Sequence, residues 1–219
     1  APIDVLQHEA KLAGFVALSK ERRAEVVAAV ASLNERFSSS QGAWAAATSP
    51  AAFVIARQDA RTLQQATAYM AALAQSQDGS ALRDEAMAEN IKWLHDNLPP
   101  GARMVVSAHN LHIADVKDRM GKTLRATLGP AWLSIGLELG DGSYQALRMR
   151  TDGARANIEA IRFPPPPPGQ ANAALLHGGP VYALDLRTLP AAGEVATWFR
   201  SPQIVRAAGY GVSSDAAMT

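Results

Sequence analysis

Apolar positions recur with the period of an α-helix through most of the first 98 residues. Over Ser19–Phe37 they return every three or four positions, behind a serine that can cap the helix. Ser49-Pro50 predicts the start of a second helix, because proline is favoured at the first helical position. A third helix is expected over Ser80–Leu98, and the segment 38–42 is expected to be a connector between the first two. The segment 1–98 is therefore expected to be helical.

Short apolar runs replace this period after residue 101 and indicate strands. Four segments carry such runs: Met104–Val106, Trp132–Glu138, Ser143–Met149 and Val181–Leu186. The third is expected to be the hairpin partner of the second, because Gly140-Asp141-Gly142 predicts a turn between them. Helices are expected between the first two strands, one ending near Met120 and one over Lys122–Leu128. This order predicts a helix-rich α/β fold, with a strand-containing segment at 101–219.

Five consecutive prolines, Pro164–Pro168, lie in an insert that runs from Phe163 to Gly179. A polyproline II segment can dock in a groove. A plain surface loop accounts for the same composition. Both interpretations stay open.

Composition and charge narrow the classes of function. The 219 residues are 48% hydrophobic and 19% charged, which is typical of a globular protein. The 21 Lys and Arg nearly cancel the 20 Asp and Glu, so the net charge of +1 gives no reason to expect nucleic acid or an anionic membrane as a partner. The chain has no cysteine, which excludes disulfides, thiolate nucleophiles and cysteine-bound zinc. With no signal peptide visible and no run of about 18 apolar residues, we expect a soluble chain.

The third helix is expected to present two polar residues on its apolar face. At about 100° per residue, its apolar arc runs through Leu82 and Ile91, and Asp84 falls on the opposite side. Arg83 and Asn90 lie near the middle of the arc, where an unpaired guanidinium or amide is costly to bury. We expect them to line a pocket in which the arginine grips a carboxylate. A buried arginine paired with an acidic residue is the alternative.

The most distinctive group of candidate residues is His109-Asn110-Leu111-His112, directly after the first expected strand. Ligands of open α/β sheets bind at the carboxyl ends of the strands. Histidine can exchange a proton near neutral pH or donate a hydrogen bond to an oxyanion, and asparagine can hold a substrate. The sequence therefore predicts that His109, Asn110 and His112 belong to a functional site.

Other chemistries find less support in the sequence. His109 and His112 have an acceptable spacing for metal ligands, and Asp115 or Glu138 could add oxygen atoms. The sequence contains no Gly-x-Ser-x-Gly elbow, so it gives no support for a serine nucleophile. No Gly-x-Gly-x-x-Gly or Walker loop argues for a nucleotide.

Several of these segments together resemble the erythromycin esterase family. In that family an Arg-Asp-x-x-Met-Ala-x-Asn helix precedes an Ala-His-Asn-x-His strand end, as residues 83–90 and 108–112 do here. Gly121 and the run Gly136–Tyr144 resemble the elements that follow. The resemblance implies a small, mainly parallel sheet flanked by helices. It also implies a hydrolase without metal or cofactor that adds water to a small-molecule ester or lactone. The best-known members open the macrolactone ring of erythromycin, a macrolide, and so confer antibiotic resistance.

The same resemblance assigns roles to individual residues. His109 and His112 match the second active-site histidine pair, and Arg83 matches the pocket arginine. We add Asn90, Asn110 and Glu138 as candidates for binding the substrate. Family members also have a Gly-Glu-x-x-His-Gly motif near the N-terminus, whose histidine is the usual base for the attacking water. This motif is absent, so we expect the chain to be a C-terminal portion whose general base lies on a further segment.

Two alternatives to an esterase remain at this point. One is a non-catalytic or polysaccharide-associated binding protein that keeps the pocket without the base. The other is a hydrolase that uses a metal bound by His109 and His112. The sequence makes no prediction of the substrate, the oligomeric state or the compartment.

Overall fold

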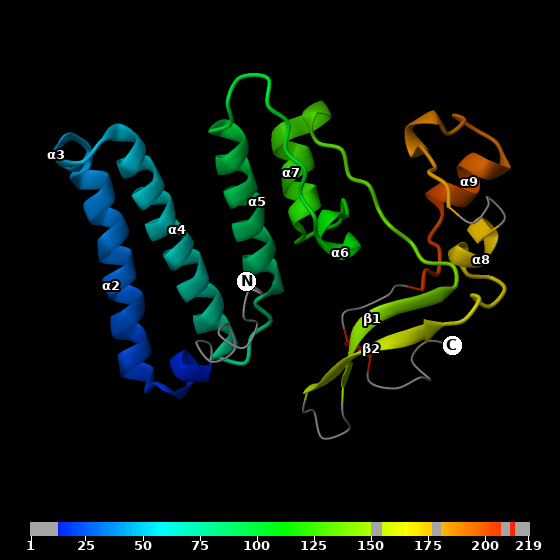
Figure 1. Ribbon diagram of the computed structural model, residues 1–219, viewed down its shortest axis with the longest axis horizontal. Helices are drawn as coiled ribbons and strands as arrows, with labels where there is room; N and C mark the ends of the chain where they lie inside the picture. Colours follow the sequence, from blue (N-terminus) through cyan, green and yellow to red (C-terminus); the bar gives the residue numbers. More distant parts are fainter. Residues whose placement is uncertain (1–12, 150–154, 177–180, 207–210, 213–219) are drawn as a thin grey trace. The chain divides into compact units, whose positions relative to one another are not determined.

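The chain forms two compact units, and the boundary between them in the sequence falls between Gly136 and Leu137. The computed structural model describes residues 13–149, 155–176, 181–206 and 211–212 (Figure 1). The first unit ends at Gly136, so the change of sequence pattern at residues 98–101 falls inside it. All the residues of the Arg-Asp helix and of the His-Asn-x-His segment belong to this first unit.

Helices dominate the first unit and confirm the predicted helical period. Its long helices are α2 (Lys20–Ser39), α4 (Pro50–Leu73) and α5 (Ser80–Asp96). Ser19 and Ser49 cap the first two, because their hydroxyl oxygens accept hydrogen bonds from the backbone N–H groups of Arg22 and Ala52. The expected connector is instead helical except at Ser40: its first two residues end α2, and its last two begin a short helix, α3 (Gln41–Ala47). No helix in the described ranges combines the length and apolar character needed to cross a membrane.

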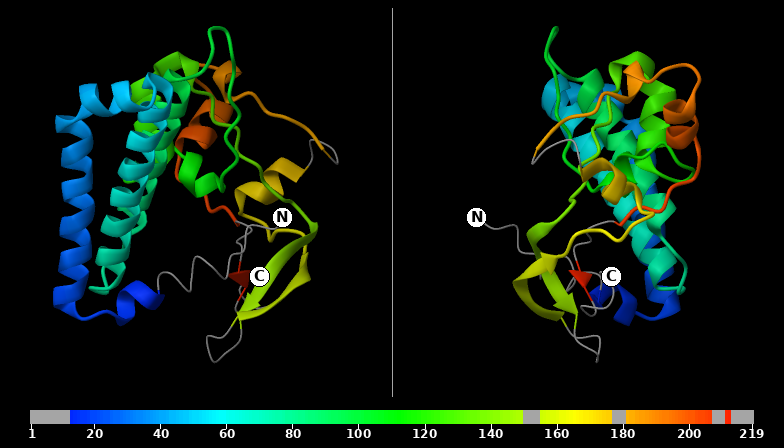
Figure 2. Two further views of the ribbon diagram at one scale, coloured as in Figure 1. Left: turned by 60° about the vertical axis from the view of Figure 1, so that its left-hand side comes forward. Right: turned by 90° about the vertical axis from the view of Figure 1, so that its right-hand side faces the viewer.

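The helices of the first unit pack as a row. Figures 1 and 2 show α4 lying between α2 and α5, and α5 lying between α4 and α7 (Met120–Leu128). The short helix α6 (Asn110–Ile113) packs against α7, which is followed by a 3-10 turn, Gly129–Ala131. The helix expected to end near Met120 is therefore only one turn long, and the next helix begins where we expected it to end.

The hydrophobic core of this unit lies between α5 and α7. Ala88 and Ile91 of α5 are buried against Met120 and Leu124 of α7. Five other apolar side chains pack on this cluster from outside the two helices: Met104, Val106, Ala108, Ile113 and Trp132. The core therefore holds the chain before and after α6 against the Arg-Asp helix.

The first two expected strands are extended but pair with no described strand. Residues 103–108 and 132–135 alternate between exposed and partly buried side chains, as a half-buried strand does. Val105 on the outward side is 96% exposed, and Ile135 is 68% exposed. The expectation of a buried central strand at Met104–Val106 and of a second strand at Trp132–Glu138 is therefore wrong for the described chain.

The sheet lies in the second unit and is mainly antiparallel. Strand β1 (Gly142–Met149) pairs antiparallel with β2 (Arg155–Phe163), with Gly142 opposite Phe163. The two-residue strand β3 (Gly211–Val212) pairs parallel with β1, so the order is β2-β1-β3. The predicted mainly parallel sheet is therefore wrong. The two long strands run antiparallel, and the residues between them in the sequence are too few for the helical crossover that joins parallel neighbours. The chain remains a helix-rich protein with a small sheet.

Three helical segments lie in the described part of the second unit. They are α8 (Ala171–Leu175), a 3-10 turn at Leu186–Thr188, and α9 (Glu194–Arg200). The segment 181–186, expected to be a strand, is exposed and pairs with no strand in the described part of the chain.

A buried arginine joins the proline run to the sheet. The Arg206 guanidinium donates hydrogen bonds to the carbonyl oxygens of Gly140 and Pro164, and it lies 3.8 Å from the centre of the Phe163 ring. The backbone N–H of Arg206 donates to Asn172 Oδ1 at 2.8 Å. Pro166 is buried as well. The beginning of the proline run thus packs within its own unit.

We predict that Gly121→Ala destabilises the first unit. A Cβ at this position of α7 would overlap the carbonyl oxygen of Ile113 and lie 2.7 Å from that of Ala114, and neither backbone atom can move freely. Overpacking of this kind costs about 1–3 kcal/mol. The free energy of unfolding, measured by urea denaturation, is expected to fall by that amount. Gly42→Ala is the control in α3, because its Cβ would meet nothing within 4 Å. It is expected to be neutral or stabilising by up to about 1 kcal/mol, and an equal loss in both variants would contradict the packing explanation.

A second prediction concerns the ion pair between α4 and α5. The Arg61 guanidinium donates to both carboxylate oxygens of Glu89 at 2.7 Å, and this hydrogen bonding lowers the pKa of Glu89 from its usual 4.5. The pair is about 40% exposed, so water screens it, and Glu89→Gln is expected to cost only about 0.5–1 kcal/mol near neutral pH. Because the folded pKa is lowered, this contribution is present above pH 4.5 and disappears as the pH falls through the lowered pKa. Urea unfolding at a series of pH values measures it, with Glu35→Gln in α2 as the control. A cost that persists in acid would contradict the ionic origin.

Candidate active site

A buried carboxylate on α5 is the centre of the candidate site. Asp84 is 0% exposed, whereas its neighbour Arg83 is exposed. The sequence predicts the reverse, with Arg83 on the buried face of the helix and Asp84 facing solvent. The buried face of α5 runs through Asp84, Ala88 and Ile91, which are spaced four and three residues apart, and Leu82 is 42% exposed. The predicted apolar arc through Leu82 is therefore wrong, because Leu82 faces solvent.

His112 lies against this carboxylate and is held at both ring nitrogens. Its Nδ1 contacts Asp84 Oδ1, and its Nε2 lies 3.0 Å from Nη1 of Arg83. A carboxylate only accepts hydrogen bonds and a guanidinium only donates them. Both contacts therefore favour the neutral tautomer that carries its proton on Nδ1 and its lone pair on Nε2. This is the arrangement in which an imidazole can take a proton from water.

A second cation contacts the other oxygen of the same carboxylate. Arg119 Nη1 lies 3.3 Å from Asp84 Oδ2, and the arginine side chain is 23% exposed. Arg119 immediately precedes α7 and contributes its side chain from the opposite side of the core to α5. The negative charge of Asp84 is thus compensated by a nearby guanidinium, without which its burial would be costly.

His109 has a different role from His112. It is the N-cap of α6, and its Nδ1 accepts a hydrogen bond from the backbone N–H of Leu111 at 3.2 Å. When this ring is neutral, its proton is therefore on Nε2. His109 is exposed, and Asn110 places its Oδ1 beside Gly136. The two predicted histidines thus sit on one helical turn with opposite tautomers.

The single turn of α6 is fixed in place by its neighbours. The Ser134 hydroxyl donates to the carbonyl oxygen of Ile113 at 3.0 Å and accepts from the Trp132 indole N–H at 2.8 Å. The absence of a Cβ at Gly121 lets α7 approach the same carbonyl group. These contacts hold His112 at the distance from α5 that the pairing with Asp84 requires.

Two of the predicted site residues lie elsewhere. Asn90 accepts a hydrogen bond from Gln58 Nε2 at 2.8 Å, so its amide is engaged with α4. Glu138 belongs to the second unit, where Asn172 Nδ2 lies 3.3 Å from its Oε2. The first unit therefore brings together Arg83, His109, Asn110 and His112 of the predicted residues.

Sequence reasoning missed Asp84 and Arg119. The spacing of Asp84 with Ala88 and Ile91 was a usable signal, because an acidic residue in register with two small or apolar ones can share their buried face. Arg119 gave no such signal, since it lies in a polar stretch before α7. Among the described residues, no three His, Asp or Glu side chains converge as metal ligands would.

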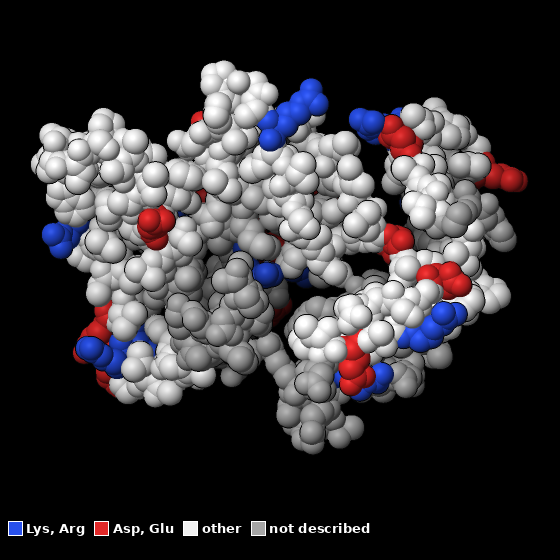
Figure 3. All heavy atoms as spheres, viewed as in Figure 1, with Lys and Arg blue, Asp and Glu red and all other residues white. Residues whose placement is uncertain are grey.

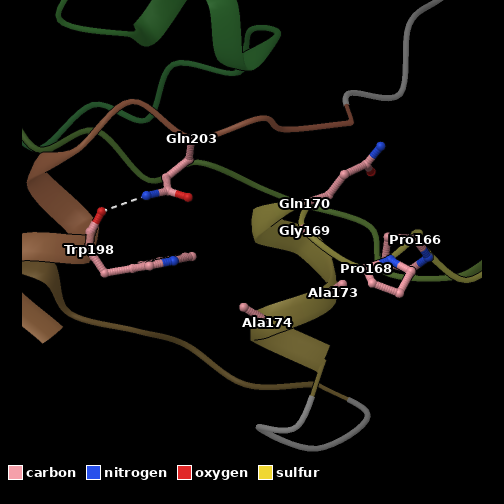
Figure 4. A pocket seen from close by; sticks show the side chains of 8 residues that line it. All are labelled: Pro166, Pro168, Gly169, Gln170, Ala173, Ala174, Trp198 and Gln203. Atoms are coloured by element: carbon pink, nitrogen blue, oxygen red, sulfur yellow. Dashed lines mark hydrogen bonds between the residues drawn. The ribbon is translucent and has the colours of Figure 1, made fainter. Parts of the chain in front are cut away.

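A separate cleft of about 390 Å³ lies in the second unit, away from these residues in the sequence. It is lined by Pro166, Pro168, Gly169, Gln170, Ala173, Ala174, Trp198 and Gln203. Figure 4 shows Trp198 and Gln203 joined by a hydrogen bond from the Gln203 amide to the Trp198 carbonyl, at 2.8 Å. None of the predicted site residues lines this cleft. In Figure 3, acidic and basic side chains on the visible face are scattered among neutral ones, in keeping with the small net charge.

We predict that removal of the buried carboxylate destabilises the first unit strongly. Asp84→Ala leaves Arg119 and His112 without their shared acceptor, and breaking a buried pair costs about 3–5 kcal/mol. The exposed neighbour provides the matched control, and Glu85→Ala is expected to change stability by less than about 0.5 kcal/mol. Urea unfolding measures both. Similar costs for the two variants would contradict the placement of Asp84 inside the unit.

The comparisons with known proteins agree with the sequence motifs. A family model described as erythromycin esterase matches residues 4–217. No curated protein and no solved structure matches the chain significantly.

Proposed function

Because the chain belongs to the erythromycin esterase family, we propose that it hydrolyses a carboxylic ester or lactone at the cluster formed by Asp84, His112 and Arg83. The family points to a hydrolase. The contact of a buried aspartate with Nδ1 of His112 supports this specific site, because it prepares Nε2 to accept a proton. The proposed reaction needs no resident metal.

In the proposed reaction His112 activates water. The imidazole Nε2 takes a proton from a water molecule while the water oxygen attacks the ester carbonyl carbon. The imidazolium that forms is stabilised by Asp84, which keeps its Nδ1–H in place. On collapse of the tetrahedral intermediate the bond to the alkoxide breaks, and the proton on Nε2 passes to the leaving oxygen. Proton and electron pairs then balance, and a carboxylic acid and an alcohol result.

Arg83 is the proposed electrophile. Its guanidinium lies beside Nε2 of His112, but the arginine side chain is exposed and has several rotatable bonds, so it is free to turn away from the ring. When an ester carbonyl oxygen attracts the guanidinium, Nε2 becomes accessible to water. The positive charge then stabilises the oxyanion as it forms. His109 and Asn110, on the same turn as His112, are the proposed contacts to the rest of the substrate.

This assignment differs from the pattern implied by the family motif. The chain contains no Gly-Glu-x-x-His-Gly, so the histidine that is usually the base has no counterpart in it. The Nδ1 of His112 contacts the carboxylate of Asp84, whereas the Nδ1 of His109 accepts the hydrogen bond that caps α6. We therefore assign the role of base to His112.

Hydrolysis of 4-nitrophenyl butyrate and of erythromycin provides the test. His112→Ala is expected to lower kcat/KM about 10²–10⁴-fold, which is the usual contribution of a general base. His95→Ala is the matched control, because His95 lies on α5 and pairs with Asp96 away from the site, and its activity is expected to stay within about twofold. Unchanged turnover in both His109→Ala and His112→Ala would overturn the site.

The same assay separates the two alternatives to this proposal. Saturable binding of erythromycin by the wild-type chain, without turnover of either compound, would favour a binding protein and overturn the hydrolase. Loss of activity with a chelator, restored by a divalent metal, would favour a metal-dependent reaction at His109 and His112.

A further inference from the structure

Arg119 contacts the one oxygen of Asp84 that His112 does not use. Its Nη1 lies 3.3 Å from Oδ2, while Oδ1 contacts the ring of His112. Arg83, the other arginine of the site, contacts Nε2 of the imidazole. The two arginines therefore have separate tasks, and only Arg119 reaches the carboxylate.

The chain places Arg119 firmly. Asp118, the residue before it, has a φ of 61°, a left-handed conformation that aspartate adopts more readily than most residues. Met120 and Leu124, which follow it in α7, are 1% exposed and are held in the core against α5. A turn on one side and a buried helix on the other thus aim the guanidinium at Asp84.

We propose that Arg119 is a positioning residue, which acts through Asp84 to hold His112 in the Nδ1–H tautomer. The proposal rests on the assignment of His112 as the base. A carboxylate with 0% exposure needs its charge compensated, and it must keep Oδ1 directed at Nδ1 if it is to select the tautomer. Arg119 does both by occupying Oδ2.

Loss of this cation has a defined consequence. Without a donor at Oδ2, the carboxylate can turn that oxygen towards another donor, and the ring of His112 is no longer held to one tautomer. A neutral imidazole with its proton on Nε2 cannot accept a proton from water at that atom. The fraction of competent enzyme falls, so kcat falls. KM stays nearly constant, because the proposed substrate contacts are on Arg83 and α6.

The first experiment reads the tautomer directly. In protein labelled with ¹⁵N-histidine, the ring nitrogen shifts of His112 distinguish Nδ1–H from Nε2–H, and a His112→Gln spectrum identifies its signals among the five histidines. The wild type is expected to show Nδ1–H. Arg119→Met is expected to shift His112 towards Nε2–H, and Arg119→Lys, which restores a cation, is expected to return it. Arg125→Met is the matched control, because Arg125 lies on α7, which begins directly after Arg119, and its Nε lies 3.6 Å from Oδ2 of Asp115 instead of contacting Asp84.

Kinetics with 4-nitrophenyl butyrate supply the second readout. Arg119→Met is expected to lower kcat about 10-fold with KM within about twofold, a loss typical of residues that orient a functional side chain. Arg119→Lys is expected to recover most of it, and Arg125→Met is expected to match the wild type. Circular dichroism checks that each variant is folded, and if Arg119→Met is not, Arg119→Gln takes its place.

The two readouts separate failure of this inference from failure of the proposed function. An unchanged His112 tautomer in a folded Arg119→Met or Arg119→Gln variant would overturn the role of Arg119. If Arg119→Met shifts the His112 tautomer but the wild-type protein hydrolyses no ester, the proposed reaction is overturned and the positioning role of Arg119 stands.

Discussion

The first unit is organised around a carboxylate that water does not reach. Asp84 is the only acidic residue among the buried ones of the described chain, and it lies on a helix face otherwise made of Ala88 and Ile91. A charge in such a place is tolerated only if donors surround it. The donors come from two other segments, since His112 belongs to α6 and Arg119 precedes α7. The requirement to satisfy one carboxylate thus ties three helices to one another.

The packing around α6 makes sense in view of this requirement. A helix of four residues gains little stability by itself. A longer helix would be stabilised by its own backbone hydrogen bonds. Here the stabilising contacts come instead from the Ser134 hydroxyl, from the cap at His109 and from the close approach of α7 at Gly121. Contacts with neighbouring residues therefore offset the conformational entropy lost on ordering this turn, and they fix its position.

Local features of the fold could be predicted from the sequence, whereas features set by distant partners could not. Ser19 and Ser49 mark helix starts because the capping hydrogen bond joins residues only three apart. The burial of Asp84 depends on donors 28 and 35 residues away, which no helical projection of α5 contains. The sequence predicts the strand at Ser143–Met149 but not its pairing with residues 155–163, because sequence alternation does not specify a partner strand. The sequence motif identifies Arg83, His109 and His112 as site residues, whereas the parts played by Asp84 and Arg119 are visible only in the structure.

The two histidines of the His-Asn-x-His segment are equivalent in the sequence and differ in the structure. Both can exchange protons, and both lie on one turn of helix. The backbone N–H of Leu111 occupies Nδ1 of His109, which leaves the proton of its neutral ring on Nε2 and makes that atom a donor. The carboxylate at Nδ1 of His112 reverses this and makes Nε2 an acceptor. The turn therefore offers one imidazole Nε2 that donates a hydrogen bond and one that accepts, when both rings are neutral. The helix cap and the buried aspartate together therefore give opposite tautomers to two residues that the motif alone cannot tell apart.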